Sequence, residues 1–205
     1  MEEPLVYFTV GHPAEAKYVE KMSRFLAFVV PVRRADEARE MVKRYQNEYH
    51  DARHVCWAYM LGPERKEWQL NDNGEPSGTA GKPILGQINS RELTDVLVIV
   101  VRYFGGIKLG TSGLIAAYRQ AASDALDEAG RIECVRKREL TVTFSYAAAD
   151  GVMKIVKRSD VELLDKKFDN LCSIRMLTPM SISDELKGRL GALDGVTVDD
   201  SGESV

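Results

Sequence analysis

Two glycine-rich turns and the apolar run between them decide the fold of this chain. The sequence reads NDNGEPSGTAG at residues 71–81 and VLVIVVRYFGGIKLGTSG at residues 96–113. The run at 96–101 is apolar on both of its faces, which predicts a central strand that is covered on both sides. Each turn leads into a segment of helical pattern. We therefore expect a sheet with helices packed against it.

Working outward from this run, segments of strand and helix type alternate up to about residue 135. Strands are predicted at 25–30 and 55–61, and helices at 36–49, 77–88 and 111–129. Residues 1–20 are weakly patterned and are interpreted as a tail or a short leading element. The segment around Trp68 fits neither type clearly.

Each predicted helix has polar residues suited to cap its start, because their side-chain oxygens accept hydrogen bonds from free backbone N–H groups. The candidate caps are Asp36 for the first helix, Ser77 or Thr79 for the second, and Thr111 or Ser112 for the third. Gly130 directly follows the third helix and is expected to end it.

The pattern changes after about residue 134. Alternation at Leu140, Val142, Phe144 and Tyr146 predicts a half-buried strand. The following elements are predicted to be a helix at 148–158, strands at 161–168 and 171–177, a helix at 183–190 and a strand at 196–198. Their β-α-β-β-α-β order matches the split βαβ unit. We therefore expect an α+β protein of two domains, residues 1–135 and 136–205.

Composition limits the class of protein. The chain has 205 residues, of which 44% are hydrophobic and 29% charged, as in globular proteins. Its net charge of −3 gives no global basic field of the kind that marks many nucleic-acid binders, although a local basic patch is compatible with it.

The cysteines and the chain's apolar runs bear on compartment and cofactors. Three cysteines, far apart and without a CxxC pair, predict buried reduced thiols instead of disulfides or a zinc site. No run is long enough to span a membrane, and the start has no signal-peptide pattern. We expect a soluble cytoplasmic protein with no metal and no cofactor.

The two turns together predict an anion site. Helix N-termini offer free N–H groups and a partial positive charge, and two of them beside Arg102 and Lys108 would hold an anion. The alternative is architectural, with the glycines serving tight turns and close helix–sheet contact. Neither a P-loop nor a GxGxxG pattern is present. The candidate residues for binding an anion or nucleic acid are Glu75, Ser77, Gly78, Thr79, Arg102, Tyr103, Phe104, Gly105, Gly106, Lys108, Gly110, Thr111, Ser112 and Arg119.

Four of the residues near these turns have more than one interpretation. Glu75 precedes a helix, which favours a role in capping and turn formation over a role as general base. His54 alternates with Cys56 along one strand face and is expected to be satisfied and partly buried. Tyr103 and Phe104 either stack on bases or pack against the core.

A Ser–His–Asp hydrolase can be assembled on paper from Ser77 or Ser112 with His54 and Asp72. The G-x-S-x-G elbow that presents such a serine is absent. We therefore predict no catalytic residues.

Several motifs resemble those of a known family. GEPSGTAG at 74–81 and VRYFGGIKLGTSGL at 101–114 are similar to the signature of the IMPACT/YigZ family, as are the residues from Ser23 to Phe25 and from Ala52 to Tyr59. The resemblance covers nearly the whole chain. It implies a first domain like the second domain of ribosomal protein S5, and a ferredoxin-like second domain similar to domain V of elongation factor G.

The resemblance also implies a function. Both of those relatives touch ribosomal RNA, and eukaryotic IMPACT members dampen a translation-control response through an activator protein and an extra RWD domain that this sequence does not show. The expectation is a non-enzymatic, translation-associated factor that binds RNA, the ribosome or a translation protein. The alternative is an enzyme or sensor that holds a small phosphate- or carboxylate-bearing ligand at the same turns.

Overall fold

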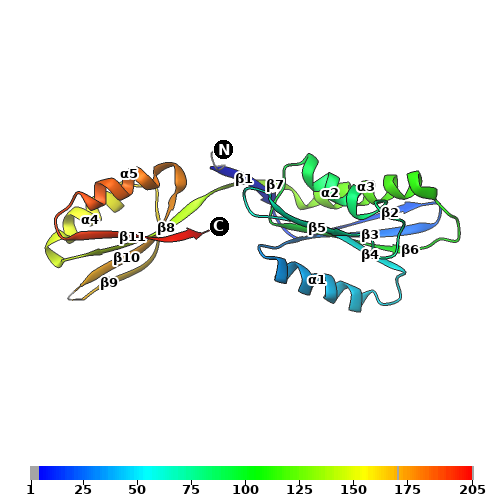
Figure 1. Cartoon of the computed structure of the whole chain (residues 1–205), viewed down its shortest axis with the longest axis horizontal. Coiled ribbons are helices and arrows are strands. Elements are labelled where there is room, and N and C mark those ends of the chain that lie inside the picture. Colours follow the sequence, from blue (N-terminus) through cyan, green and yellow to red (C-terminus); the bar gives the residue numbers. More distant parts are fainter. Residues whose placement is uncertain (1–4, 170, 205) are drawn as a thin grey trace. The chain divides into compact units, whose positions relative to one another are not determined.

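The computed structural model describes residues 5–169 and 171–204 (Figure 1). The chain divides into two compact units, one from Tyr7 to Cys134 and one from Val135 onward that also takes in Leu5 and Val6. Each unit combines sheet and helices, so the predicted α+β class is confirmed.

The 7–134 unit is built on a five-stranded antiparallel sheet in the order β2-β3-β6-β4-β5. A separate two-stranded sheet pairs β1 with β7. The elements in chain order are β1 (Val6–Val10), β2 (Ala14–Glu20), β3 (Ser23–Pro31), α1 (Ala35–Glu48), β4 (His54–Leu61), β5 (Glu67–Asn71), α2 (Gly81–Ser90), β6 (Val96–Tyr103), α3 (Gly110–Ala129) and β7 (Arg131–Val135).

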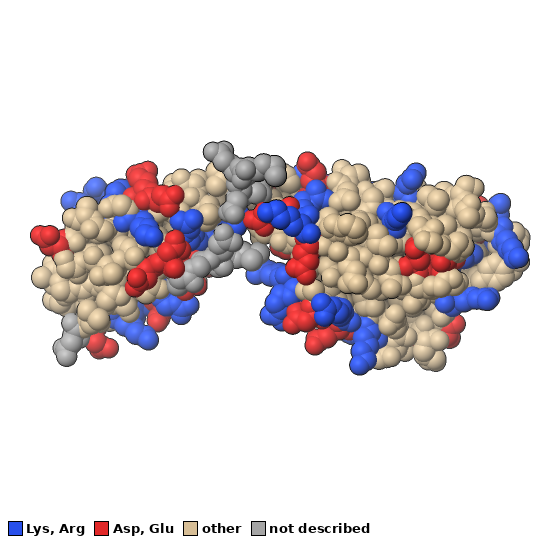
Figure 2. Space-filling model, viewed as in Figure 1, with Lys and Arg blue, Asp and Glu red and all other residues tan. Residues whose placement is uncertain are grey.

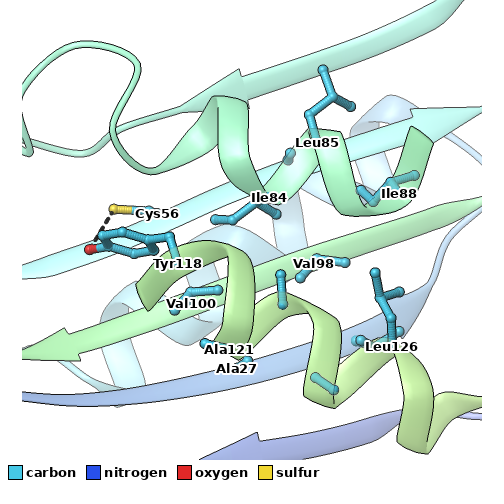
Figure 3. Packing of buried hydrophobic residues seen from close by; sticks show 14 of the residues in the cluster. Ala27, Cys56, Ile84, Leu85, Ile88, Val98, Val100, Tyr118, Ala121 and Leu126 are labelled. Carbon is cyan, nitrogen blue, oxygen red and sulfur yellow. Dashed lines mark hydrogen bonds between the residues drawn. The ribbon is translucent and has the colours of Figure 1, made fainter. Parts of the chain in front are cut away.

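Helices cover both faces of the five-stranded sheet, with α1 on one side and α2 and α3 on the other (Figure 1). Strand β6 lies in the middle of the sheet and alternates between the two cores, as its apolar run predicts. Val98 and Val100 pack towards Ile84 of α2 and Tyr118 of α3 (Figure 3), while Leu97, like Ile99 and Val101, belongs to the core under α1.

Two segments that the sequence left undecided contain strands. Residues 1–20, which were interpreted as a tail or a short leading element, include β1 and β2, and the ambiguous segment around Trp68 is strand β5. Both β2 and β5 are edge strands of the sheet. An edge strand is only partly covered, so its side chains mix polar and apolar types and its hydrophobic pattern is weak.

The predicted caps at the helix starts were wrong, although Gly130 follows the end of α3 as expected, with a positive φ of +67°. The residues at the N-cap positions of α1, α2 and α3 make no side-chain capping hydrogen bond, and α2 begins at Gly81, after both of its predicted caps. Asp36 lies inside the first turn of α1, where it accepts the N–H of Glu37. The start of α2 is held by another residue, which belongs to the site described below.

The second unit has a four-stranded antiparallel sheet in the order β11-β8-β10-β9, with two helices packed on its buried core. Its elements are β8 (Lys137–Phe144), a 3-10 turn (Tyr146–Ala148), α4 (Ala149–Val156), β9 (Glu162–Phe168), β10 (Cys172–Pro179), α5 (Met180–Gly191) and β11 (Val196–Ser204). The predicted β-α-β-β-α-β order is therefore present. Tyr146 does not continue β8, because the strand ends at Phe144 and Tyr146 is 77% exposed in the turn.

Candidate functional site

A pocket of about 440 Å³ lies in the 7–134 unit, where the two glycine-rich turns meet. The turn after β5 and the turn before α3 form two of its sides, and the start of β4 forms another. The lining residues are Arg53, His54, Gly74, Glu75, Pro76, Arg102, Phe104, Lys108, Leu109, Gly110, Thr111 and Leu114.

The floor of the pocket is a buried ion pair. Arg102 extends from the end of β6, and its Nη1 donates to Oε1 of Glu75 at 2.6 Å. The two side chains are only 6% and 3% exposed. The guanidinium also lies over the ring of Phe25, and its Nη2 is 3.5 Å from the Ser23 hydroxyl. Pairing offsets the cost of burying each charge.

A buried tyrosine contacts Glu75, and a buried cysteine contacts that tyrosine. The Tyr118 hydroxyl of α3 donates to Glu75 Oε1 at 2.8 Å, and Cys56 Sγ of β4 lies 3.3 Å from that hydroxyl (Figure 3). Burial raises the pKa of the Cys56 thiol to about 12 and raises the pKa of Tyr118 as well. Both groups are therefore neutral hydrogen-bonding partners at physiological pH, and Cys56 is not an activated nucleophile.

His54 lies at the wall of the pocket, partly buried and hydrogen-bonded, as predicted. Its Nδ1 is 2.8 Å from the carbonyl oxygen of Asn73, which accepts the proton of that nitrogen. Its Nε2 is 3.9 Å from Glu75 Oε1, which is too long for a hydrogen bond. The geometry therefore gives no direct proton transfer between His54 and Glu75.

Asp72 closes the first turn. Its carboxylate accepts the backbone N–H groups of Gly78, Ala80 and Gly81 at 2.8–3.0 Å. The N–H of Thr79 donates to the carbonyl oxygen of Pro76. The N–H groups of residues 78–81 that were predicted to bind an external anion are thus engaged within the chain, three of them by the Asp72 carboxylate. The capping role predicted for Glu75 belongs to Asp72.

The second turn remains open. Helix α3 begins at Gly110 without a side-chain cap, and Gly110 and Thr111 face the pocket. Arg53 and Lys108 are exposed at the same place, and neither has an acidic partner within residues 5–169 and 171–204. The free N–H groups of a helix start carry a partial positive charge, which adds to that of the two side chains.

A close backbone approach explains the shape of the second turn. A Cβ atom on Gly105 would lie 2.1 Å from the carbonyl carbon of Met22, and the Gly105 N–H donates to the Ser23 hydroxyl at 3.2 Å. Gly106 and Gly110 have φ values of +89° and +73°. The close backbone contact accounts for glycine at 105, and the positive φ accounts for glycine at 106 and 110. The architectural alternative therefore explains all three residues.

Four of the other predicted site residues lie away from the pocket wall. Tyr103 is half-buried and its hydroxyl donates to Asp51 at 2.8 Å. Ser77 and Ser112 are exposed but do not line the pocket, and buried Thr79 donates its hydroxyl to a carbonyl of its own turn.

Two further predicted site residues lie in depressions of the surface. Phe104 is 44% exposed and lines the pocket. Arg119 lines a separate hollow together with Gly78.

The Ser–His–Asp arrangement is not assembled. Asp72 is committed to backbone N–H groups, His54 directs Nδ1 at a carbonyl, and neither candidate serine lines the pocket. Among the described residues, no cluster of three or more His, Cys, Asp or Glu side chains is arranged to hold a metal ion. None of the described helices is both long and apolar enough to cross a membrane.

Sequence reasoning missed Arg53, Leu114 and Tyr118. Arg53 directly precedes β4, whose first residue, His54, is paired with Arg102 in the sheet. Knowing that β4 and β6 are neighbours would have placed Arg53 at the site. Tyr118 gave no separate signal, because a buried tyrosine on the inner face of a helix looks like any core residue.

The chain matches known proteins along most of its length. The model of the Impact N-terminal domain matches residues 21–126. The IMPACT family member YigZ of Escherichia coli is 31% identical over 172 residues, which cover 83% of this chain and 84% of that protein. The IMPACT family member YvyE of Bacillus subtilis is 42% identical over 140 residues, 68% of this chain and 64% of that protein, so the match spans just under two thirds of YvyE.

Two further matches extend the comparison. Protein IMPACT of Rattus norvegicus is 32% identical over 98 residues, 46% of this chain and 31% of the rat protein. A crystal structure described as that of a hypothetical protein superposes with a TM-score of 0.73 at 26% identity, covering 98% of this chain and all of the other. With the family's domain over more than half of its residues and a relative aligned along four fifths of it, this chain belongs to the IMPACT family.

Proposed function

We propose that this protein is a non-enzymatic, translation-associated factor that binds RNA through the pocket at the start of α3. One observation carries the proposal. Three cations, Arg53, Arg102 and Lys108, line the pocket against one carboxylate, Glu75. Since Arg102 and Glu75 neutralise each other, the charges of Arg53 and Lys108 remain to attract phosphate, beside the open helix start.

The charge on the rest of the surface makes this local site more relevant. Basic and acidic side chains are interspersed over the visible face of both units (Figure 2), in keeping with the net charge of −3. Binding of RNA would therefore depend on a small number of phosphate contacts and would weaken steeply with salt.

The folds of the two units also support a role in translation. We propose that the 7–134 unit corresponds to the second domain of ribosomal protein S5, and that the part from about residue 136 is a ferredoxin-like domain similar to domain V of elongation factor G. The strand order β11-β8-β10-β9 supports the second assignment. We also propose a cytoplasmic location, which the three free cysteines support.

Co-sedimentation with ribosomes and binding of a fluorescent RNA, each at low and high salt, test the proposal. The parent should bind at low salt, and Arg53→Glu with Lys108→Glu should abolish most of that binding. The control is Lys43→Glu with Arg44→Glu on α1, which changes the charge equally on the opposite side of the sheet. Absence of binding by the parent at low salt would reject the proposal.

A second candidate, a sensor or enzyme for a small ligand, is favoured by the pocket's size. Its volume of about 440 Å³ falls within the usual range for small-molecule sites, and its floor is a fixed, buried polar network. The ligand would carry a phosphate or carboxylate. A thermal-shift screen of nucleotides and carboxylates separates this candidate from the first, because a ligand at a hundred times its Kd stabilises a protein by about 2.7 kcal/mol.

A further inference from the structure

A second hollow, of about 550 Å³, lies on the outer side of α2 and α3. Some of its lining residues are close in sequence to residues that line the pocket. Pro76 lines the pocket and Gly78 the hollow, and on α3 the same holds for Leu114 and Ile115. The hollow's lining residues are Gly78, Lys82, Pro83, Gly86, Gln87, Ile115 and Arg119. The two depressions therefore share one turn and one stretch of helix.

The hollow carries only positive charge. Lys82 and Arg119 are exposed, and its lining includes no aspartate or glutamate. Over residues 5–169 and 171–204, neither cation has an acidic partner. An unpaired pair of cations around a concave surface is suited to a phosphate group.

Helix geometry connects the hollow with the pocket. Thr111, Ile115 and Arg119 are spaced four residues apart on α3, so they lie along one face of the helix. Thr111 lines the pocket and Arg119 lines the hollow. At 1.5 Å per residue the two positions are separated by about 12 Å along the helix axis, a span that no single phosphate group covers.

Gly86 supports an open floor for the hollow. It is an exposed residue inside α2, and a Cβ added there would meet no atom within 4 Å. Its φ is not in the left-handed region, so neither packing nor backbone conformation requires glycine. Glycine inside a helix costs about 0.5–1 kcal/mol relative to alanine. That cost is explained if a ligand must approach this surface of α2 closely.

We propose that the pocket and the hollow bind successive phosphates of one single-stranded RNA, which runs along the first turns of α3 from Arg53 and Lys108 to Lys82 and Arg119. This inference rests on the proposed function and specifies its ligand as a strand of several nucleotides. Phe104, exposed at the pocket, is available to stack on a base near one end of this path.

The test compares a ten-nucleotide oligouridylate with uridine monophosphate, using the full chain. Lys82→Gln with Arg119→Gln should weaken the oligonucleotide at least tenfold and leave the monophosphate unchanged. It should also reduce the slope of log K against log salt by about 1.4, since each phosphate contact on a single strand contributes about 0.7. The matched control, Lys43→Gln with Arg44→Gln, should change neither quantity.

Gly86→Ala provides a test that leaves all charges in place. It should raise the melting temperature while weakening the oligonucleotide and not the monophosphate. If the Lys82/Arg119 variant and Gly86→Ala bind the oligonucleotide as the control does, the inference is overturned. The proposed function survives that result when Arg53→Gln with Lys108→Gln still weakens binding, and it fails separately when the parent binds no RNA.

Discussion

The two glycine-rich turns resemble each other in sequence and differ in what they do with their backbone. In the first, Asp72 accepts three N–H groups and Glu75 is buried against Arg102. In the second, α3 starts without a side-chain cap, and Lys108 and Thr111 are exposed. The first turn uses its backbone N–H groups within the fold, and the second leaves the start of α3 without a side-chain acceptor.

This difference shows what a helix start needs in order to bind an anion. Glycine, serine and threonine at a turn predict that N–H groups will be present, but not that they will be free. A single carboxylate that folds back from a nearby strand is enough to use them. The difference between the two turns therefore depends on which side chains reach each of them. Five experiments test this difference.

The largest effect is expected from Glu75→Ala in the first turn. It leaves the guanidinium of Arg102 buried without a counter-charge, and loss of one partner of a buried pair costs about 3–5 kcal/mol. Urea unfolding measures the loss. The double variant Glu75→Gln with Arg102→Met should recover much of it, and an equal loss in both variants would contradict the assigned role of the pair.

Gly105→Ala tests the architecture of the second turn. The added Cβ would overlap the backbone of Met22, so we expect a loss of about 3 kcal/mol. Gly106→Ala is the matched control, because it meets no atom and only the left-handed backbone conformation opposes it, at about 1 kcal/mol. Equal melting temperatures for the two variants would show that the close approach to Met22 is absent in solution.

Alanine substitutions at the polar side chains of each turn compare the two turns directly. Asp72→Ala should destabilise the protein by about 2 kcal/mol, the upper end of the cost of losing a helix cap, because three N–H groups lose their acceptor. Thr111→Ala and Ser112→Ala should each cost less than about 0.5 kcal/mol, since neither side chain caps α3. A cost at Thr111 as large as that at Asp72 would remove the distinction between the turns.

Alkaline pH tests the buried network beneath the first turn. The Cys56 thiol has a folded pKa of about 12 against an ordinary value of 9.0, so above pH 9 the unfolded chain loses a proton that the folded chain keeps. The free energy of unfolding should therefore fall by about 1.4 kcal/mol per pH unit between pH 9 and 12 from this group. Cys56→Ala should show a shallower fall, measured by urea titrations at each pH.

The smallest effect on stability is expected from Lys108→Glu, which replaces an exposed, unpaired cation in the second turn. Its free energy of unfolding should match that of the parent within about 0.5 kcal/mol, as measured by thermal unfolding. Its affinity for RNA should nevertheless fall clearly, because repulsion replaces attraction. If the variant binds as the parent does, the second turn is as architectural as the first.

Much of the fold was predictable because strong periodicity survives in the sequence. The apolar run at 96–101 identified β6 as the central strand, and alternation at Leu140, Val142 and Phe144 identified β8. The elements that were missed, β1, β2, β5 and β7, lie outside the five-stranded sheet or at its edges, where partial exposure removes the pattern.

The site was predictable only in part. Arg102 and Lys108 were recognised, because cations beside glycine-rich turns are visible in the chain. The carboxylate of Asp72 was not recognised as a cap, because it acts on N–H groups six to nine residues further along, beyond the spacing of a local cap. A contact of this kind depends on how the turn closes in space, which no local pattern specifies.

The position of β6 in the sheet also has a consequence for how the protein folds. Hairpins β2-β3 and β4-β5 join neighbours in the chain, but β6 is made after all four of these strands and pairs with β3 on one side and β4 on the other. Closing the long loops that this insertion requires is slow compared with forming hairpins. Until it happens, the inner edges of β3 and β4 are unpaired and apolar, and the nascent chain is then most prone to aggregate.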